Sequence, residues 1–300
     1  MSMTRRLLPW FGVMAAVLAA ACAPKQAPAP IPPKPAKVAV VLGAGAAKGF
    51  AHVGVLKVLE SHKIPVSMIV GTSVGSFVGS LYASCRDAYH LQTLSFSLDR
   101  DDVVDLVLPD NGFVAGEKLE AFINRQVKGL PLEKLKIPFF AVATDIASGA
   151  ETVFATGNTG IAVRASCSIP GVFKPVRILN RTYVDGGLVS PVAVEAARRM
   201  GADVVIAVDI SSAVVDGAAP KGTVEAILKS VDIMYAKIAA VQIRRADIVI
   251  RPRVGHIASG DFSKRHEAVL EGERAAMEAL PSLQAILERL RAEGRLPASS

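Results

Sequence analysis

Aromatic side chains are scarce in this sequence, and cysteines are few. Phe, Trp and Tyr make up 5% of the 300 residues and there are three cysteines, although 51% of the residues are hydrophobic. Alanine and valine are abundant instead, and such small aliphatic side chains suit a sheet covered by closely packed helices. No basic run is interleaved with aromatic residues, so the sequence gives no support to a nucleic-acid partner.

The N-terminus lacks an apolar run of the ~20 residues that a membrane-spanning helix needs. A shorter apolar stretch over residues 7–21 follows Arg5 and Arg6 and ends directly before Cys22. Basic residues, a short apolar run and small residues at its end are typical of a bacterial secretory signal. We therefore predict that residues 1–22 are a signal peptide.

The end of this segment, Leu18-Ala19-Ala20-Ala21-Cys22, resembles a lipoprotein signal box, although its leucine stands four residues before the cysteine instead of three. The resemblance implies that Cys22 is lipidated and becomes the first mature residue. With Ala23 next and no aspartate there, it favours the outer membrane, facing the periplasm. Ordinary cleavage after an Ala-x-Ala site and retention as an uncleaved anchor stay open as alternatives.

Residues 23–36 are rich in proline and alanine and read as a semi-rigid linker. At about 3.1 Å per residue, such a linker would hold a catalytic domain roughly 30 Å or more from its anchor. A disordered leader without a mechanical role is the alternative. The net charge is +7, of which Arg5 and Arg6 supply two, and the surplus fits either attraction to an anionic lipid surface or ordinary solvation.

Residues 37–300 have the length of one α/β domain, with a core at about 38–210 and a largely helical extension at about 211–300. Strand-like and helix-like segments alternate, which predicts a three-layer α/β/α fold with a mostly parallel sheet. The strands are expected near 38–43, 67–71, 138–145, 151–155, 176–184, 203–209 and 247–251. The helices are expected near 48–61, 74–85, 116–127, 191–200, 223–244 and 264–293, the last broken in two by Pro281.

The segment Gly71-Thr72-Ser73-Val74-Gly75 follows an apolar strand and opens a small-residue helix. A GxSxG at such a junction is typical of a nucleophile elbow, in which the serine hydroxyl is exposed at a helix N-terminus. The pentapeptide alone fits equally well a tight strand-to-helix turn.

A glycine- and alanine-rich loop follows the first predicted strand. Its small residues expose backbone amides that can hold an oxyanion. A dinucleotide fingerprint would need glycine at Lys48, and a phosphate loop would need a different order of Lys48, Gly49 and Phe50. The predicted oxyanion loop comprises Gly43, Ala44, Gly45, Ala46, Lys48 and Gly49.

The third element is Asp185-Gly186-Gly187, which follows another predicted strand. By itself this is a common turn sequence. Together with the loop, the GxSxG and the segment Val163–Gly171, it resembles the patatin-like phospholipase family, bacterial branch, in that family's order across about residues 38–210.

The resemblance implies a serine acyl hydrolase that cleaves phospholipid or lysophospholipid esters without metal or cofactor. Ser73 is then the nucleophile, Asp185 the group that activates it, and the loop around Gly43–Ala46 the oxyanion hole. Most relatives carry glycine where Ala44 stands, and many where Ala46 stands. Alanine keeps the amide donor but disfavours positive φ.

Two alternatives stay open. An α/β-hydrolase triad in the order Ser, Asp, His is permitted, with His256 or His266 after Asp185. No local context marks any of the five histidines as a general base, and His52 reads as a packed helix residue. The other alternative is a non-catalytic lipid-binding or scaffold protein, which the intact Ser73 and Asp185 disfavour. The sequence leaves the oligomeric state open.

Residues 86–115 have weaker periodicity and are a candidate cap over the active site, or a variable surface connection. The apolar stripe within 262–290 is expected to face the core rather than a membrane. Cys85 and Cys167 are expected to be buried free thiols.

Overall fold

The structure is a computed structural model that describes residues 33–107, 112–211, 220 and 222–297. The predicted signal peptide, Cys22 and residues 23–32 of the predicted linker lie outside the described residues. The described residues therefore belong almost entirely to the predicted catalytic domain.

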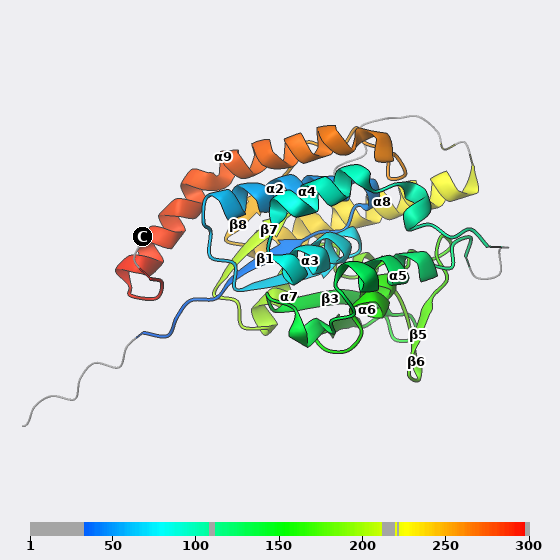
Figure 1. Ribbon diagram of the computed structural model, residues 1–300, viewed down its shortest axis with the longest axis horizontal. Helices are drawn as coiled ribbons and strands as arrows, with labels where there is room; N and C mark the ends of the chain where they lie inside the picture. Colours follow the sequence, from blue (N-terminus) through cyan, green and yellow to red (C-terminus); the bar gives the residue numbers. More distant parts are fainter. Residues whose placement is uncertain (1–32, 108–111, 212–219, 221, 298–300) are drawn as a thin grey trace, which may run out of the picture. The chain divides into compact units, whose positions relative to one another are not determined.

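One central sheet runs through the described part of the chain (Figure 1). Five of its strands are parallel neighbours in the order β3-β2-β1-β7-β8, while β4, β5 and β6 pair antiparallel at the β3 end. The strands are β1 (Val38–Leu42), β2 (Met68–Thr72), β3 (Phe139–Asp145), β4 (Glu151–Phe154), β5 (Val176–Ile178), β6 (Arg181–Asp185), β7 (Val204–Val208) and β8 (Ile248–Ile250).

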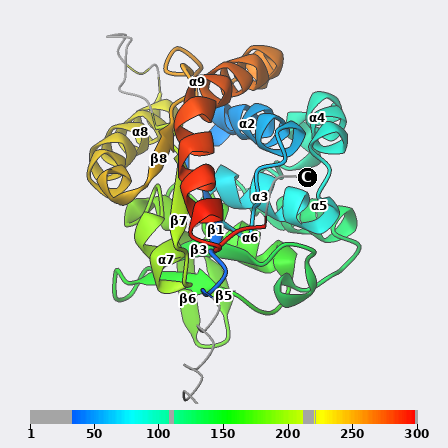
Figure 2. The same ribbon diagram turned by 90° about the vertical axis from the view of Figure 1, so that its left-hand side faces the viewer.

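Helices cover both faces of this sheet, with α7 and α8 on one side and α2, α3 and α4 on the other (Figure 2). The helices are α2 (Phe50–Ser61), α3 (Val74–Cys85), α4 (Ala88–Ser97), α5 (Glu117–Gln126), α6 (Thr159–Cys167), α7 (Val194–Arg199), α8 (Thr223–Gln242) and α9 (Arg265–Ala292). The predicted three-layer α/β fold with a mostly parallel sheet is confirmed.

The side chains of β1 alternate between the hydrophobic clusters on the two faces of the sheet. Val38, Val40 and Leu42 belong to the hydrophobic cluster that includes α2 and α9, whereas Ala39 and Val41 belong to the cluster that includes α7. Successive strand side chains point to opposite faces, so a strand buried on both faces reads as a continuous apolar run. The run Val-Ala-Val-Val-Leu at 38–42 is such a strand.

The register of β3 brings two distant parts of the chain together. Val142 of β3 pairs with Thr72, the last residue of β2, and the next residue, Ala143, pairs with Asp185, the last residue of β6. The residue that follows Thr72 is Ser73. The sheet therefore places Ser73 and Asp185 beside each other, although 112 positions separate them in sequence.

Between β2 and β7, the structure differs from the sequence-based expectations for secondary structure at three segments. The single strand expected at 176–184 is a hairpin, because Leu179 turns the chain at a φ of 54° and lies 91% exposed. Helix α4 was not expected, although the Asp87 side chain caps it by accepting from the His90 amide. Helix α6 was also missed. Its glycine, threonine, serine and β-branched residues are poor helix formers, but Gly160 lets it pack closely against α5.

Helix α9 continues through Pro281, so the predicted break there is wrong. A proline inside a helix removes one hydrogen bond and disfavours the helix. Burial on both sides of the proline offsets this, because Leu280, Leu283 and Leu287 lie in the core. The predicted core-facing stripe is thus confirmed, with Leu270 and Met277 as exposed exceptions. Among the described residues, no helix has the length and hydropathy required to cross a bilayer.

Helices α2 and α9 approach so closely that glycine is required on both. A Cβ on Gly54 would lie 2.0 Å from the Val269 carbonyl oxygen, and one on Gly272 would lie 2.0 Å from the Ala51 carbonyl oxygen.

We expect Gly54→Ala to lower the free energy of unfolding by about 1–3 kcal/mol or more, because the helices must separate. Denaturant unfolding measures this.

The matched control is Gly260→Ala. A Cβ at Gly260 meets nothing within 4 Å, and its φ lies outside the left-handed region. This variant should unfold within about 0.5 kcal/mol of the wild type. Equal midpoints for Gly54→Ala and the wild type would show that the helix crossing is looser than described.

Candidate active site

Ser73 stands between β2 and α3, as the N-cap residue of the helix, with φ 55° and ψ −127°. A non-glycine residue in this region is strained, and such strain is typical of a nucleophile elbow. The elbow also needs a close backbone approach, since a Cβ on Gly75 would lie 2.0 Å from the Leu42 carbonyl oxygen. Gly71 lies in β2 and Val74 begins α3, and the Thr72 hydroxyl donates to the Ser190 carbonyl at 2.9 Å.

The Ser73 hydroxyl donates directly to Asp185, with 2.6 Å between Oγ and Oδ2. The other carboxylate oxygen, Oδ1, accepts the Gly187 amide at 2.7 Å. Both side chains are buried, Ser73 at 4% exposure and Asp185 at 0%. The structure thus brings the predicted nucleophile and the predicted activating group into contact, with no side chain between them.

Residues that the sequence analysis did not assign hold this pair in place. The Ser166 hydroxyl accepts the Ser73 amide at 2.9 Å and donates to the Val142 carbonyl at 2.5 Å. The Thr144 hydroxyl donates to the Asp185 carbonyl at 2.9 Å. Ser166 lies in the Val163–Gly171 segment that carries the family resemblance. That resemblance is the sequence feature that could have indicated a role for Ser166 at the site.

Burial dominates the electrostatics of the Asp185 carboxyl. Its removal from water raises its pKa from 3.8 to about 6, because burial penalises the charged form. The hydrogen bond from Ser73, the one from the Gly187 amide and the nearby Tyr235 hydroxyl oppose this rise. At neutral pH the carboxyl is therefore largely ionised and close to the pKa range in which a general base works well.

The predicted oxyanion loop divides into two parts. The Gly43 amide donates to the Val208 carbonyl at 3.0 Å, and the Ala44 amide donates to the Pro191 carbonyl at 2.9 Å. These two amides are therefore engaged within the fold. No hydrogen bond from the Gly45 or Ala46 amide is seen in the described part of the chain, and Ala46 lines the same cavity as Ser73.

Ala46 adopts a φ of 49°, the conformation that alanine tolerates less well than glycine. Ala44, by contrast, has no positive φ. Of the two positions where relatives more often carry glycine, only Ala46 requires the left-handed region, so only there does alanine add strain.

His52 holds the oxyanion loop in place through a hydrogen bond. The side chain is fully buried, and its Nε2 donates to the Gly43 carbonyl at 2.8 Å. Burial lowers the pKa of His52 to about 4, so the ring is neutral at physiological pH. The prediction that His52 is a packed, hydrogen-bonded helix residue is confirmed.

Lys48 and Gly49 close the loop. The Lys48 amide donates to the Gly45 carbonyl at 3.1 Å. The buried side-chain ammonium of Lys48 pairs with Asp232 of α8, also at 3.1 Å. Asp232 further accepts the Ser259 hydroxyl at 2.8 Å. Gly49 leaves room for Val74 of the elbow. The C-terminal third of the chain is thereby tied to the oxyanion loop.

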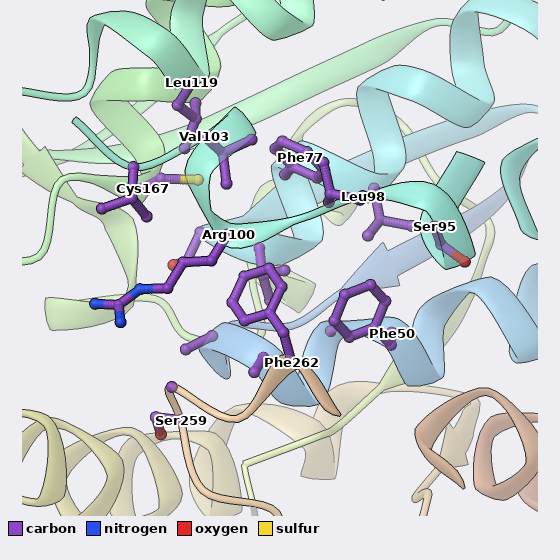
Figure 3. Close-up of a pocket in the computed structure, with 18 of the residues that line it drawn as sticks. Phe50, Phe77, Ser95, Leu98, Arg100, Val103, Leu119, Cys167, Ser259 and Phe262 are labelled. Carbon is purple, nitrogen blue, oxygen red and sulfur yellow. The ribbon is translucent and has the colours of Figure 1, made fainter. Parts of the chain in front are cut away.

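Ser73 lines a predominantly apolar cavity of about 210 Å³. Figure 3 shows ten labelled residues around this cavity. Residues between Leu91 and Val104, together with Val114, line part of this cavity, and a capping role for residues 86–115 stays a prediction. Phe50 and Phe262 lie side by side at another wall, with ring centroids 5.5 Å apart. Other lining residues are Phe77, Leu98, Val103, Leu119 and Phe122.

The remaining candidate residues lie away from the dyad or serve packing. His256 is half-exposed and its Nε2 bonds Glu267 at 2.6 Å, while the His266 ring packs on Phe96. Cys167 is a buried free thiol that lines the cavity, whereas Cys85 is a free thiol that is only partly buried. In the described ranges, no group of three or more His, Cys, Asp and Glu side chains is placed to hold a metal ion.

Gly186 and Gly187 form the turn after Asp185 and bring it close to its neighbours. A Cβ on Gly186 would lie 2.2 Å from the Val142 carbonyl oxygen, and one on Gly187 would lie 2.2 Å from the Tyr235 ring. Tyr235 belongs to α8 and was not singled out in the sequence. The Asp-Gly-Gly motif is therefore a packing requirement as well as a turn.

The chain is similar in sequence to several known proteins. Over 183 residues, the chain is 36% identical to human patatin-like phospholipase domain-containing protein 6, a match that covers 58% of this chain and 13% of that protein. Over 293 residues, it is 28% identical to lysophospholipase NTE1 of Coccidioides immitis, covering 87% and 18% respectively. The chain thus spans less than a fifth of these relatives.

Among solved structures, VipD from Legionella pneumophila shares the fold with a TM-score of 0.59 at 12% identity, over 83% of this chain and 67% of that chain. The family model described as "Patatin-like phospholipase" matches residues 40–198, from β1 to α7, a range that includes Ser73 and Asp185. The chain therefore belongs to the patatin-like phospholipase family.

Proposed function

We propose that this protein is a serine acyl hydrolase that cleaves carboxyl esters of lipids through a Ser73–Asp185 dyad. The observation that carries the proposal is the 2.6 Å contact between the Ser73 hydroxyl and the buried Asp185 carboxylate, beside an apolar cavity. A nucleophile in contact with its base is the arrangement that covalent acyl transfer needs.

In the proposed mechanism, Asp185 accepts the Ser73 proton as Oγ attacks the ester carbonyl. The Gly45 and Ala46 amides hold the developing oxyanion. Protonated Asp185 then donates the proton to the leaving alcohol, which departs and leaves an acyl ester on Ser73. Water attacks this ester while Asp185 accepts its proton, and transfer of that proton back to Ser73 Oγ releases the fatty acid and restores the resting enzyme.

The substrate class follows from the cavity and from the relatives. Apolar walls beside the nucleophile suit a fatty acyl chain, because burial of each methylene contributes about 0.8 kcal/mol. The names of the relatives are phospholipase and lysophospholipase. We therefore propose phospholipid or lysophospholipid esters as substrates.

The triad alternative is less well supported than the dyad. His256 is bound to Glu267 and does not line the cavity beside Ser73, while Asp185 already contacts Ser73. The non-catalytic alternative is disfavoured because a scaffold would have no need for a strained serine against a buried carboxylate.

Loss of either dyad residue should remove activity. We expect Ser73→Ala and Asp185→Ala to lower kcat for short-chain aryl and phospholipid esters at least about 10³-fold, and His256→Gln to stay within about threefold of the wild type. Hydrolysis by the fragment that begins near Lys37 measures this. Equal loss in His256→Gln would support the triad, and an inert wild type would support the scaffold.

The pH dependence follows from the state that Asp185 must have. As a base it acts only when ionised, and burial raises its pKa to about 6. We expect kcat/KM to be constant above that pH and to fall about tenfold per unit below it. A midpoint near 4, or one near 6.5 that disappears in His256→Gln, would contradict Asp185 as the base.

We further propose that lipidation of Cys22 anchors the enzyme to the bacterial outer membrane, facing the periplasm. The signal-like residues 1–22 and the proline-rich linker support this. Cells given radiolabelled palmitate should yield labelled protein that sediments with membranes, and Cys22→Ser should lose the label and move to the soluble fraction. Labelled Cys22→Ser would contradict the proposal.

A further inference from the structure

Tyr235 is a buried tyrosine that the proposed mechanism does not yet use. It lies in the middle of α8 and is 2% exposed. Its ring belongs to a hydrophobic cluster with Ala44 of the oxyanion loop, Ile169 and Val172. Among the described residues, its hydroxyl has no hydrogen-bond partner at normal geometry. Buried hydroxyls almost always have a partner, so this one requires an explanation.

The Tyr235 hydroxyl lies against the peptide that holds Asp185. A Cβ on Gly187 would be 2.6 Å from the Tyr235 hydroxyl oxygen, and the Gly187 amide donates to Asp185 Oδ1 at 2.7 Å. The hydroxyl also helps to lower the pKa of the Asp185 carboxyl, so the two groups are neighbours, and a small shift of the ring or of the carboxylate would join them.

Three titratable groups face Tyr235: Asp185 of β6, Cys167 of α6 and Asp232 of its own helix. Burial raises the pKa of the Cys167 thiol, so this group is neutral and a weak acceptor. Asp232 is already bound to Lys48 and Ser259. Asp185 is the acceptor with capacity left, because a carboxylate can accept about four hydrogen bonds and this one has two partners.

The catalytic cycle creates the need for a further donor. In the resting enzyme Ser73 donates to Asp185 Oδ2. In the acyl-enzyme the Ser73 oxygen is esterified and has no hydrogen, so Asp185 loses that donor just when it must act as base toward water. A buried carboxylate that loses a donor binds a proton more readily, and a protonated Asp185 cannot activate water.

We propose that Tyr235 is a positioning residue that donates a hydrogen bond to Asp185 in the acyl-enzyme and keeps it ionised for deacylation. This inference rests on the proposed Ser73–Asp185 dyad. It gives α8, which lies beyond the segment that matches the family, a defined part in the reaction.

The test is the pH profile of deacylation, measured separately from acylation by pre-steady-state hydrolysis of a 4-nitrophenyl ester. Tyr235→Phe keeps the ring and removes only the hydroxyl. We expect its deacylation rate to be about tenfold below the wild type at pH 6 and within about twofold at pH 8. The acylation burst should change less, since Ser73 still donates to Asp185 in that step.

The matched control is Tyr82→Phe, which removes another buried tyrosine hydroxyl on the nucleophile helix α3, away from Asp185. Its deacylation profile should overlay the wild type. A Tyr235→Phe profile that overlays the wild type, or one lowered equally at every pH, would overturn the proposal, the latter because it indicates packing alone. Absence of a Ser73 acyl-enzyme in the wild type would overturn the proposed dyad as well, so the two failures are distinguishable.

Discussion

The arrangement of this protein depends on one buried contact, the hydrogen bond from Ser73 to the Asp185 carboxylate. A carboxylate removed from water is stable only if hydrogen bonds replace its hydration. Most of the features around the dyad supply these bonds or fix their geometry. The Gly187 amide satisfies one oxygen, Ser73 the other, and Thr144 and Ser166 hold the backbone on both sides.

The shared partner strand β3, which pairs parallel with β2 and antiparallel with β6, explains how two residues so far apart in sequence reach this contact. Ser73 follows β2 and Asp185 ends β6, and both strands pair with adjacent residues of β3. Functional residues of open α/β sheets gather at the carboxyl ends of their strands. The oxyanion loop follows β1 at the same edge, and His52 fixes it through the Gly43 carbonyl. Residues from several other elements line the apolar cavity. Helix α8 contacts the oxyanion loop through Asp232 and the turn after Asp185 through Tyr235.

Much of this could be predicted from the sequence, and the limits have physical causes. Continuous apolar runs such as 38–42 identified the buried strands, and the motifs around Ser73 and Asp185 identified residues that the fold brings together. Helix α6 was missed because packing at Gly160 overrides the poor helix propensity of its glycine, threonine, serine and β-branched residues. The roles of Tyr235 and Asp232 could not be predicted from the sequence. Tyr235 contacts Gly187 and Asp232 pairs with Lys48, and neither distant contact leaves a pattern in the sequence of the helix itself.

The most direct test of the account is reaction with an alkyl fluorophosphonate, followed by intact mass measurement and peptide mapping. We expect a single adduct on Ser73 in the wild type and essentially none in Asp185→Ala at the same exposure, because without the carboxylate the hydroxyl has no base. An adduct elsewhere, or labelling of Asp185→Ala at the rate of the wild type, would contradict it.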